Sequence, residues 1–333
     1  MKCYHVAKFD CFKSSRLNMQ SAWDKSSFYI HLSDKSQDNS LNLTFPQLLR
    51  ISRASSDKDK FIFHAQSSLV YLVTLKLLGV LSRDQIIYDI HDLNVIQEKL
   101  NYMRLRGISM HILEFVTLKI MRISSITVSS GLAIIIAKRF KSKRPLVVRN
   151  ISAEMREGSM KKEVDQNKMV YFGTFDRLPN KFFVELEREG LQLDIYGRFN
   201  NGKASQTMQD ALEQGVIKYC GEYNPGDMGF LRNYAYLYYN IDPYDVNYRF
   251  AGPNKFFQAL VYGLVILTPQ GYSELSFLLK DIPGAQTTIK GDIVNLTNRK
   301  PVFDEDYSSR VESLLAKLKT DSQENYRTLI PYE

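Results

Sequence analysis

The chain has 333 residues, of which 44% are hydrophobic and 24% are charged, and its formal net charge is +8. These values exclude a collagen-like, disulfide-rich or wholly disordered protein, and the length predicts two domains. The positive charge favours anionic partners, namely nucleotides, phospholipid surfaces or nucleic acid.

The first part of the chain gives the weakest pattern, with a strand expected at 27–32, a polar loop at 33–42 and a short helix at 45–52. From residue 61 on, short apolar runs alternate with helical segments. The expected strands are 61–64, 85–90, 126–129 and 145–149, and the expected helices are 67–79, 95–123 and 131–140. This alternation predicts βαβ units and a mostly parallel sheet.

Residues 154–168 are polar and charged without apolar periodicity, which predicts a linker between residues 1–153 and a second domain. The alternation then restarts. Strands are expected at 169–172, 192–196, 216–220, 235–240 and 264–268, and helices at 182–189, 204–214, 228–233, 255–262 and 272–280. The second domain is expected over 169–305. An amphipathic helix at 308–319 lies in a tail, 306–333, that we expect to pack back toward the first domain.

Three expected strands of the second domain are followed by glycine, at Gly173, Gly197 and Gly221. Ligands of open parallel sheets bind at the carboxyl ends of the strands, where a glycine lets a phosphate approach the backbone. A tight turn explains any one of these glycines equally well, but the series favours a nucleotide site. The sequence has neither a GxGxxG nor a GxxxxGK[ST] motif, which argues against a dehydrogenase or a P-loop NTPase.

The segment 248–269, YRFAGPNKFFQALVYGLVILTP, resembles the donor-binding segment of family 4 of the retaining glycosyltransferases, in the branch with a Pro-Asn-Lys motif. Four further segments resemble that family in the same order, namely 88–93 (YDIHDL), 126–133 (ITVSSGLA), 147–150 (VVRN) and 169–175 (MVYFGTF). The resemblance implies an α/β protein with the GT-B fold, in which two Rossmann-like domains face a central cleft. The first domain would then bind the acceptor and the second the nucleotide sugar.

The resemblance also implies an activity. A sugar would pass from a nucleoside diphosphate sugar to a hydroxyl of a glycan or lipid-linked acceptor, with retention of configuration, in bacterial-type polysaccharide, lipopolysaccharide or glycoconjugate synthesis. The sequence has no DxD motif, so we expect no metal and no cofactor besides the donor itself. No recognised motif supports binding to nucleic acid.

The resemblance assigns roles to residues of this chain. His91, at the end of an expected strand, is the candidate catalytic residue, although a helix-capping or core histidine is the alternative. The candidate donor-binding residues are Gly173, Arg177, Lys181, Gly197, Arg198, Asn254, Lys255 and Gln258. A lysine at a helix start attracts a diphosphate, whereas Asn254 is equally well explained as a helix cap.

The sequence departs from the family at two positions. Phe250 and Gln258 occupy the places of a glutamate pair, and Gln258 can bond a ribose hydroxyl only without the help of a charge. These departures motivate an alternative function, a catalytically inactive GT-B protein that acts as a binding or scaffold subunit.

Two features bear on localisation. The first five residues lack the apolar core of a signal peptide, and no run reaches the roughly 20 apolar residues that span a bilayer, so we expect a cytoplasmic protein. The segment 100–122 mixes apolar residues with four cations, which is typical either of a helix resting on anionic lipid or of a core helix with basic ends. The first interpretation places the protein on the inner face of the plasma membrane.

Overall fold

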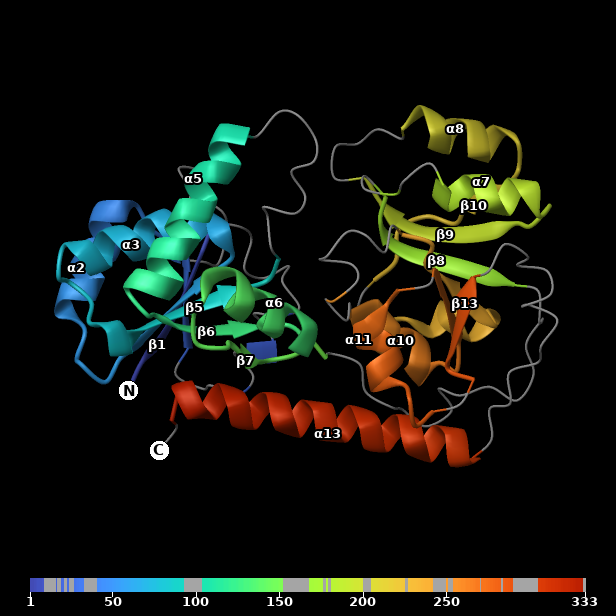
Figure 1. The fold of residues 1–333 in the computed structure, drawn as a ribbon. Coiled ribbons are helices and arrows are strands. Elements are labelled where there is room, and N and C mark those ends of the chain that lie inside the picture. The colour runs from blue at the N-terminus through green and yellow to red at the C-terminus, as the bar shows by residue number, and fades with distance from the viewer. Residues whose placement is uncertain are drawn as a thin grey trace. The chain divides into compact units, whose positions relative to one another are not determined.

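The computed structural model (Figure 1) divides into two compact units, Met1–Ser152 with Leu318–Glu333, and Ala153–Lys317. It describes residues 1–8, 16, 19–20, 23, 27–32, 41–92, 104–151, 168–175, 178, 181–199, 205–224, 227–241, 250, 254–269, 271–282, 284–289 and 305–331. The expected linker, 154–168, therefore lies outside the described residues except for Lys168.

The first unit contains a seven-stranded sheet in the order β3-β2-β1-β4-β5-β6-β7, and every neighbouring pair is parallel. The strands are β1 (Cys3–Ala7), β2 (Ser27–His31), β3 (Leu41–Asn42), β4 (Lys60–His64), β5 (Ile86–Ile90), β6 (Ser124–Thr127) and β7 (Leu146–Val147). Strands β1 and β5 are buried along their whole length. Continuous burial is expected of parallel strands that helices cover on both faces.

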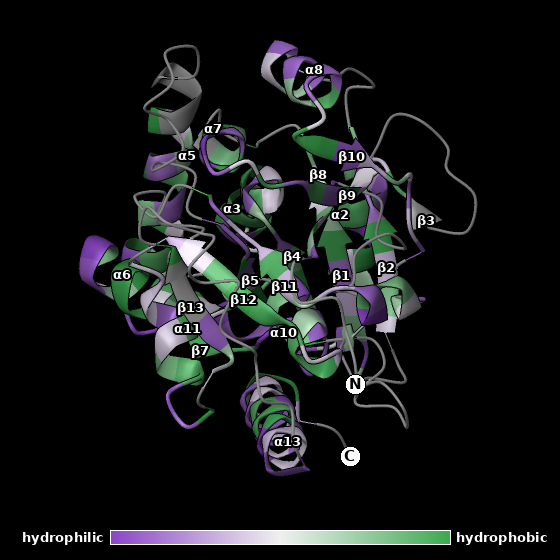
Figure 2. Cartoon of the chain, turned by 90° about the vertical axis from the view of Figure 1, so that its right-hand side faces the viewer, coloured by the Kyte–Doolittle hydropathy of each residue, from purple (hydrophilic) through white to green (hydrophobic). Residues whose placement is uncertain are grey.

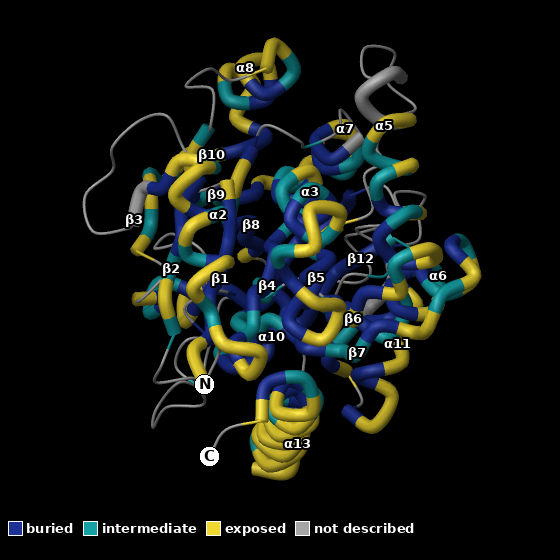
Figure 3. Tube along the Cα trace, turned by 90° about the vertical axis from the view of Figure 1, so that its left-hand side faces the viewer, coloured by how far each residue is buried: buried dark blue, intermediate teal, exposed yellow. Residues whose placement is uncertain are grey.

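The helices of this unit connect the strands (Figure 3). They are α2 (Phe45–Ala54), α3 (Leu69–Leu77), α5 (Arg104–Phe115) and α6 (Ser130–Phe140), with the short turns η2 (Gln66–Ser68), η3 (Arg83–Gln85) and the π-helical η4 (Val116–Ile120). Ser129 caps α6, because its side chain accepts a hydrogen bond from the Leu132 amide at 3.2 Å.

The second unit contains a six-stranded parallel sheet in the order β10-β9-β8-β11-β12-β13. The strands are β8 (Met169–Thr174), β9 (Leu193–Arg198), β10 (Ile217–Tyr219), β11 (Tyr236–Tyr238), β12 (Val265–Pro269) and β13 (Gln286–Ile289). The helices are α7 (Lys181–Arg188), α8 (Gln206–Glu213), η5 (Gly229–Asn233), α10 (Asn254–Val261) and α11 (Ser273–Leu278). Strands β8 and β12, which both have a neighbour on each side, are largely hydrophobic (Figure 2).

The last helix, α13 (Glu305–Leu329), is about twice as long as the sequence pattern predicts. Its carboxyl-terminal part belongs to the first unit, where Ser322 accepts a hydrogen bond from the Arg149 amide at 3.0 Å and Asn325 donates to the Val147 carbonyl at 2.9 Å. Tyr326 joins the core cluster of that sheet. Residues 320–329 carry few apolar side chains, so periodicity alone does not reveal that this part is helical.

Other differences from the sequence predictions have local causes. Strand β1 was not predicted because His5 interrupts its apolar run, and β13 because Gln286–Ile289 is mostly polar. The helix expected at 95–123 is described only from residue 104, and it changes to a π-helix at Val116 before ending at Ile120. Strand β9 runs past Tyr196, where it was expected to end, to Arg198. Each helix in the described part of the chain is too short or too polar to span a bilayer.

Candidate functional site

The carboxyl end of the second sheet brings two of the predicted glycines together. Strands β8 and β9 pair in register, with Gly173 opposite Gly197. Both glycines have positive φ, +132° and +146°, and a Cβ on Gly197 would lie 1.8 Å from the Gly173 carbonyl oxygen. Gly197 is therefore required by the close approach of the two backbones, whatever else it does. A Cβ on Gly221 would have no atom within 4 Å, so the steric reason that applies to Gly197 does not apply there.

Lys255 reaches from α10 to this end of β8. Its Nζ donates a hydrogen bond to Tyr171 Oη at 3.1 Å. The same Nζ lies 4.4 Å from the Tyr171 ring centroid, 5.3 Å from that of Tyr239 and 6.0 Å from that of Phe172. A Cβ at Gly173 would lie 2.8 Å from Nζ, so the glycine leaves room for the ammonium group. Lys255 thus lies in an aromatic cage at a strand end.

The electrostatics of Lys255 are unbalanced. The residue is partly buried, but its ammonium group faces rings, and no carboxylate among the described residues compensates it. The loss of hydration lowers the pKa of Lys255 to about 7. Ring quadrupoles offset only part of the cost of burying a cation. An anion bound beside Nζ would supply the missing compensation.

The other predicted donor contacts are less well placed by the structure. Asn254 is the first residue of α10, and Gln258 lies one turn beyond Lys255 and is partly buried. Arg198 is exposed at the last position of β9. Lys181 is the first residue of α7, but its side chain is not described, and Arg177 lies outside the described residues. The structure thus brings Gly173, Gly197 and Lys255 together, and the remaining contacts stay predictions.

Tyrosines supply much of the second unit's core. Tyr236, Tyr238 and Tyr239 are buried, and Tyr239 also contacts Lys255. Tyr171 was not predicted to be functional, because its place in an apolar strand is typical of a core residue. Its hydroxyl, which also lies 3.3 Å from the Thr174 carbonyl, gives it a polar role that sequence alone does not reveal.

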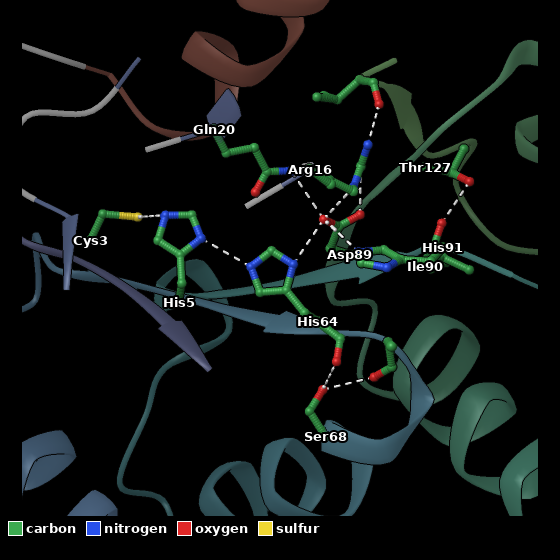
Figure 4. A network of polar contacts seen from close by, with 12 residues as sticks. Cys3, His5, Arg16, Gln20, His64, Ser68, Asp89, Ile90, His91 and Thr127 are labelled. Atoms are coloured by element: carbon green, nitrogen blue, oxygen red, sulfur yellow. Dashed lines mark hydrogen bonds and ion pairs between the residues drawn. The ribbon is translucent and has the colours of Figure 1, made fainter. Parts of the chain in front are cut away.

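The first sheet carries a different cluster, centred on Asp89 of β5 (Figure 4). Arg16 donates from Nε and Nη2 to the two carboxylate oxygens at 2.7 and 2.6 Å, and Gln20 donates to Oδ2 at 3.0 Å. His64 Nδ1 and His91 Nε2 lie 3.0 and 3.2 Å from Oδ2. Both oxygens of this carboxylate therefore receive hydrogen bonds from Arg16, and Oδ2 has three further nitrogen atoms close to it.

The charges of the Asp89 cluster are balanced. Burial alone would raise the pKa of Asp89, but Arg16 and the neighbouring histidines outweigh it and hold this pKa well below its usual range. Burial lowers the pKa of His64 to about 4, and burial together with His64 lowers that of His5, whose Nδ1 lies 2.9 Å from His64 Nε2. The cluster therefore contains a buried ion pair, Arg16 with Asp89, beside two imidazoles, His5 and His64, that burial keeps neutral.

The predicted residue His91 is the accessible member of this cluster. It follows β5 directly, and its side chain is 22% exposed, whereas Asp89 is completely buried. One potential metal-ligand atom from each of His64, Asp89 and His91 lies within 4.8 Å of the other two, a spacing that could hold a cation. Arg16 already occupies both carboxylate oxygens, however, so a metal ion would have to displace a bidentate ion pair. The arrangement of these residues around Asp89 is better suited to orienting the His91 imidazole than to binding a metal ion.

The sequence matches no family model and no curated protein. Among solved structures, the chain is similar to HepE from Anabaena in complex with UDP and glucose, with a TM-score of 0.67, 11% identity and 99% of each chain covered. It is also similar to WaaG, a glycosyltransferase involved in lipopolysaccharide biosynthesis, with a TM-score of 0.56, 12% identity, and 100% of this chain and 96% of WaaG covered.

A third similar structure is the apo form of OtsA, with a TM-score of 0.58, 10% identity and both chains covered completely. These similarities extend over the whole chain and show its fold. The protein has the GT-B fold, an α/β fold with two Rossmann-like units that each contain a parallel sheet. The predicted fold class is confirmed.

Proposed function

We propose that the protein is a glycosyltransferase that moves a sugar from a nucleoside diphosphate sugar to a hydroxyl acceptor. The observation that carries this proposal is Lys255, a cation without a carboxylate partner among the described residues, held at the carboxyl end of a parallel strand. In open α/β sheets this is where ligands bind. The fold of the chain and the UDP bound to HepE support the same assignment.

The diphosphate leaving group develops negative charge as the glycosidic bond to it breaks. Lys255 would stabilise that charge, and the amino end of α10 would add the partial positive charge of its unpaired amides. Both contributions come from the protein itself, which is consistent with a metal-independent reaction. Retention of configuration is the outcome implied by the resemblance of the Pro-Asn-Lys segment.

We further propose that His91 contacts the donor sugar. Asp89 Oδ2 lies 3.2 Å from His91 Nε2 and orients the imidazole, whose side chain is 22% exposed at the end of β5. An acceptor from polysaccharide, lipopolysaccharide or glycoconjugate synthesis suits this assignment, and WaaG, which shares the fold, acts in lipopolysaccharide biosynthesis.

We also propose that the protein associates with membranes through α5. Ile108, Ile112 and Phe115 are 56%, 54% and 42% exposed, and their spacing places them on one face of the helix. Exposed apolar side chains in a row are typical of a surface that meets a partner or a lipid. A position on the membrane would give the enzyme access to a lipid-linked acceptor.

The decisive experiment is calorimetric titration with the nucleotide that stabilises the protein most in a thermal-shift screen of UDP-, GDP-, ADP- and CMP-linked ligands. Lys255→Ala removes a charge-assisted contact and is expected to weaken binding by about 1.5–3 kcal/mol without loss of the fold. The matched control is Lys218→Ala, which removes an exposed lysine of β10 and should leave the affinity unchanged.

The same titration tests Gln258. Gln258→Glu is expected to bind the donor at least as tightly as the parent, because a carboxylate accepts a stronger hydrogen bond from a ribose hydroxyl, and Gln258→Ala is expected to bind it more weakly. Equal affinities of the parent and Lys255→Ala would refute the donor site. A folded parent that binds none of the nucleotides would favour the alternative, an inactive scaffold protein.

A further inference from the structure

A second feature with unbalanced charge lies at the opposite edge of the first sheet. A pocket of about 500 Å³ is formed by the connections that lead into β5, β6 and β7, and Ser124 and Leu146, the first residues of β6 and β7, line it. His91 follows the carboxyl end of β5, so this amino-terminal edge lies at the other end of the strands. All of the lining residues belong to the first unit.

The lining of this pocket is strongly basic. Six of its residues are cationic and one, Asp84, is acidic. The cations, all of them exposed or partly exposed, are Arg83, Lys119, Arg122, Lys141, Lys143 and Arg144. We refer to this pocket as the basic pocket. Asp84 lies 3.5 Å from Arg83 and compensates at most that one charge.

Helix capping accounts for some of these cations. Lys119 lies in the last turn of η4, and its Nζ donates to the carbonyl of Lys141, the residue that caps α6, at 2.9 Å. Cations are favoured near helix carboxyl ends, so this pair has a structural explanation. Lys143 and Arg144 lie beyond the last turn of α6, so capping of that helix does not account for their positions.

Sharp turns of the backbone where η4 and α6 end bring the remaining cations to the pocket. Arg122 and Lys141 both have left-handed conformations, with φ of +54° and +47°, which a residue with a side chain rarely adopts. The chain therefore turns sharply after η4 and after α6 and places Arg122 and Lys143 in the lining of one pocket. Like charges gathered in this way repel one another, and a bound anion relieves the repulsion.

Apolar residues beside the pocket indicate the source of that anion. Ile120 is 63% exposed and lies between Lys119 and Arg122 in the chain. The exposed row on α5, which ends at Phe115, leads into the same turn. Cations that flank an exposed apolar side chain suit the boundary between head groups and acyl chains of a bilayer. A free phosphate ion has no apolar part that could contact Ile120.

We propose that the basic pocket binds the phosphate of an anionic lipid head group while Ile120 and the α5 row contact the acyl region. This inference rests on the membrane association proposed above for α5 and adds a head-group site to it. It does not depend on the sugar-transfer reaction, because none of the pocket residues contributes to the proposed donor site. It assigns the chain a second anion site at the amino-terminal edge of the first sheet.

The test is cosedimentation of the full chain with phosphatidylglycerol vesicles and with phosphatidylcholine vesicles. The triple variant Arg122→Gln/Lys143→Gln/Arg144→Gln is compared with a control that loses the same charge elsewhere in the first unit, Arg50→Gln/Arg53→Gln/Lys58→Gln. Each cation near an anionic bilayer raises binding about fivefold, so the pocket variant should bind phosphatidylglycerol at least tenfold more weakly than the control. High salt should release the parent.

Three outcomes would overturn the proposal: equal loss in both variants, parent binding to phosphatidylcholine as strong as to phosphatidylglycerol, and binding of glycerol phosphate in solution without any binding to vesicles. Binding of the parent to duplex DNA in preference to vesicles would likewise identify a different partner. The thermal shift of the pocket variant with UDP, measured alongside, should equal that of the parent. A change there would concern the donor site, and the vesicle comparison would still decide whether the pocket binds lipid.

Discussion

The two parallel sheets carry opposite electrostatic arrangements at their carboxyl ends. In the first unit, Asp89 is buried but is contacted by Arg16, Gln20 and two histidines. In the second unit, Lys255 extends into a cage of aromatic rings without a carboxylate partner among the described residues. Both residues are ionisable groups at equivalent edges of similar sheets, so the difference between them lies in their neighbours.

This difference separates a contribution to stability from a contribution to binding. A buried carboxylate whose donors are all provided by the protein holds its surroundings in place and has little left to offer a ligand. A desolvated ammonium group lowers the stability of the free protein, and this cost is recovered only when an anion binds. Removing Asp89 should therefore damage the fold, whereas removing Lys255 should damage binding alone.

The largest expected effect is that of Asp89→Asn. The substitution leaves Arg16 buried without its counter-charge, and breaking a buried ion pair in this way typically costs about 3–5 kcal/mol. The single tryptophan, Trp23, packs against Tyr326 in the core of the first unit, so its fluorescence during denaturation reports on that unit. Asp84→Asn, which changes a carboxylate that is 82% exposed, is the control and should shift stability by less than about 0.5 kcal/mol.

An unchanged midpoint of the Trp23 transition in Asp89→Asn would contradict the view that this cluster stabilises the fold. A loss of nucleotide binding by Asp89→Asn without any loss of stability would contradict the comparison even more directly. It would make Asp89, rather than Lys255, the residue whose charge serves the ligand.

The next effect in size concerns the backbone that supports Lys255. Gly197→Ala places a Cβ 1.8 Å from the Gly173 carbonyl oxygen at a positive φ and should destabilise the second unit by roughly 3 kcal/mol or more. Gly221→Ala imposes a positive φ without a clash, so we expect only about 1–2 kcal/mol. Far-ultraviolet circular dichroism follows both units, while the Trp23 transition should stay in place. Equal losses in the two variants would mean that the close approach of β8 and β9 is not what selects glycine at 197.

Much of the fold could be predicted from the sequence, because short apolar runs alternating with helical segments specify parallel α/β units. Strands such as β5 and β12 were predicted to within a residue or two at each end. Strand β1 and the second half of α13 were not predicted. His5 and the polar residues 320–329 interrupt the apolar pattern that would have indicated burial. Their partners lie far away in the sequence, and periodicity registers only local pattern.

The candidate site shows the same division. Lys255 and His91 could be selected because each lies at the end of a strand or the start of a helix, where ligands bind in such folds. The residues that determine the charge state and contacts of Lys255 and His91 could not be selected from the sequence. Tyr171 precedes Lys255 by 84 positions and Arg16 precedes Asp89 by 73, so only the folded chain shows that one ammonium lacks a counter-charge and that one carboxylate has it.

The most direct test of the account is to count the protons taken up when UDP binds. With its pKa near 7, Lys255 is mostly neutral in the free protein at about pH 8, and a bound diphosphate raises that pKa and protonates it. Calorimetry in buffers of different ionisation enthalpy should therefore show an uptake approaching one proton by the parent, a smaller uptake near pH 6, where Lys255 is already charged, and none by Lys255→Met at about pH 8. If the parent and Lys255→Met bind UDP with the same proton uptake at about pH 8, Lys255 does not hold the diphosphate and the central claim is wrong.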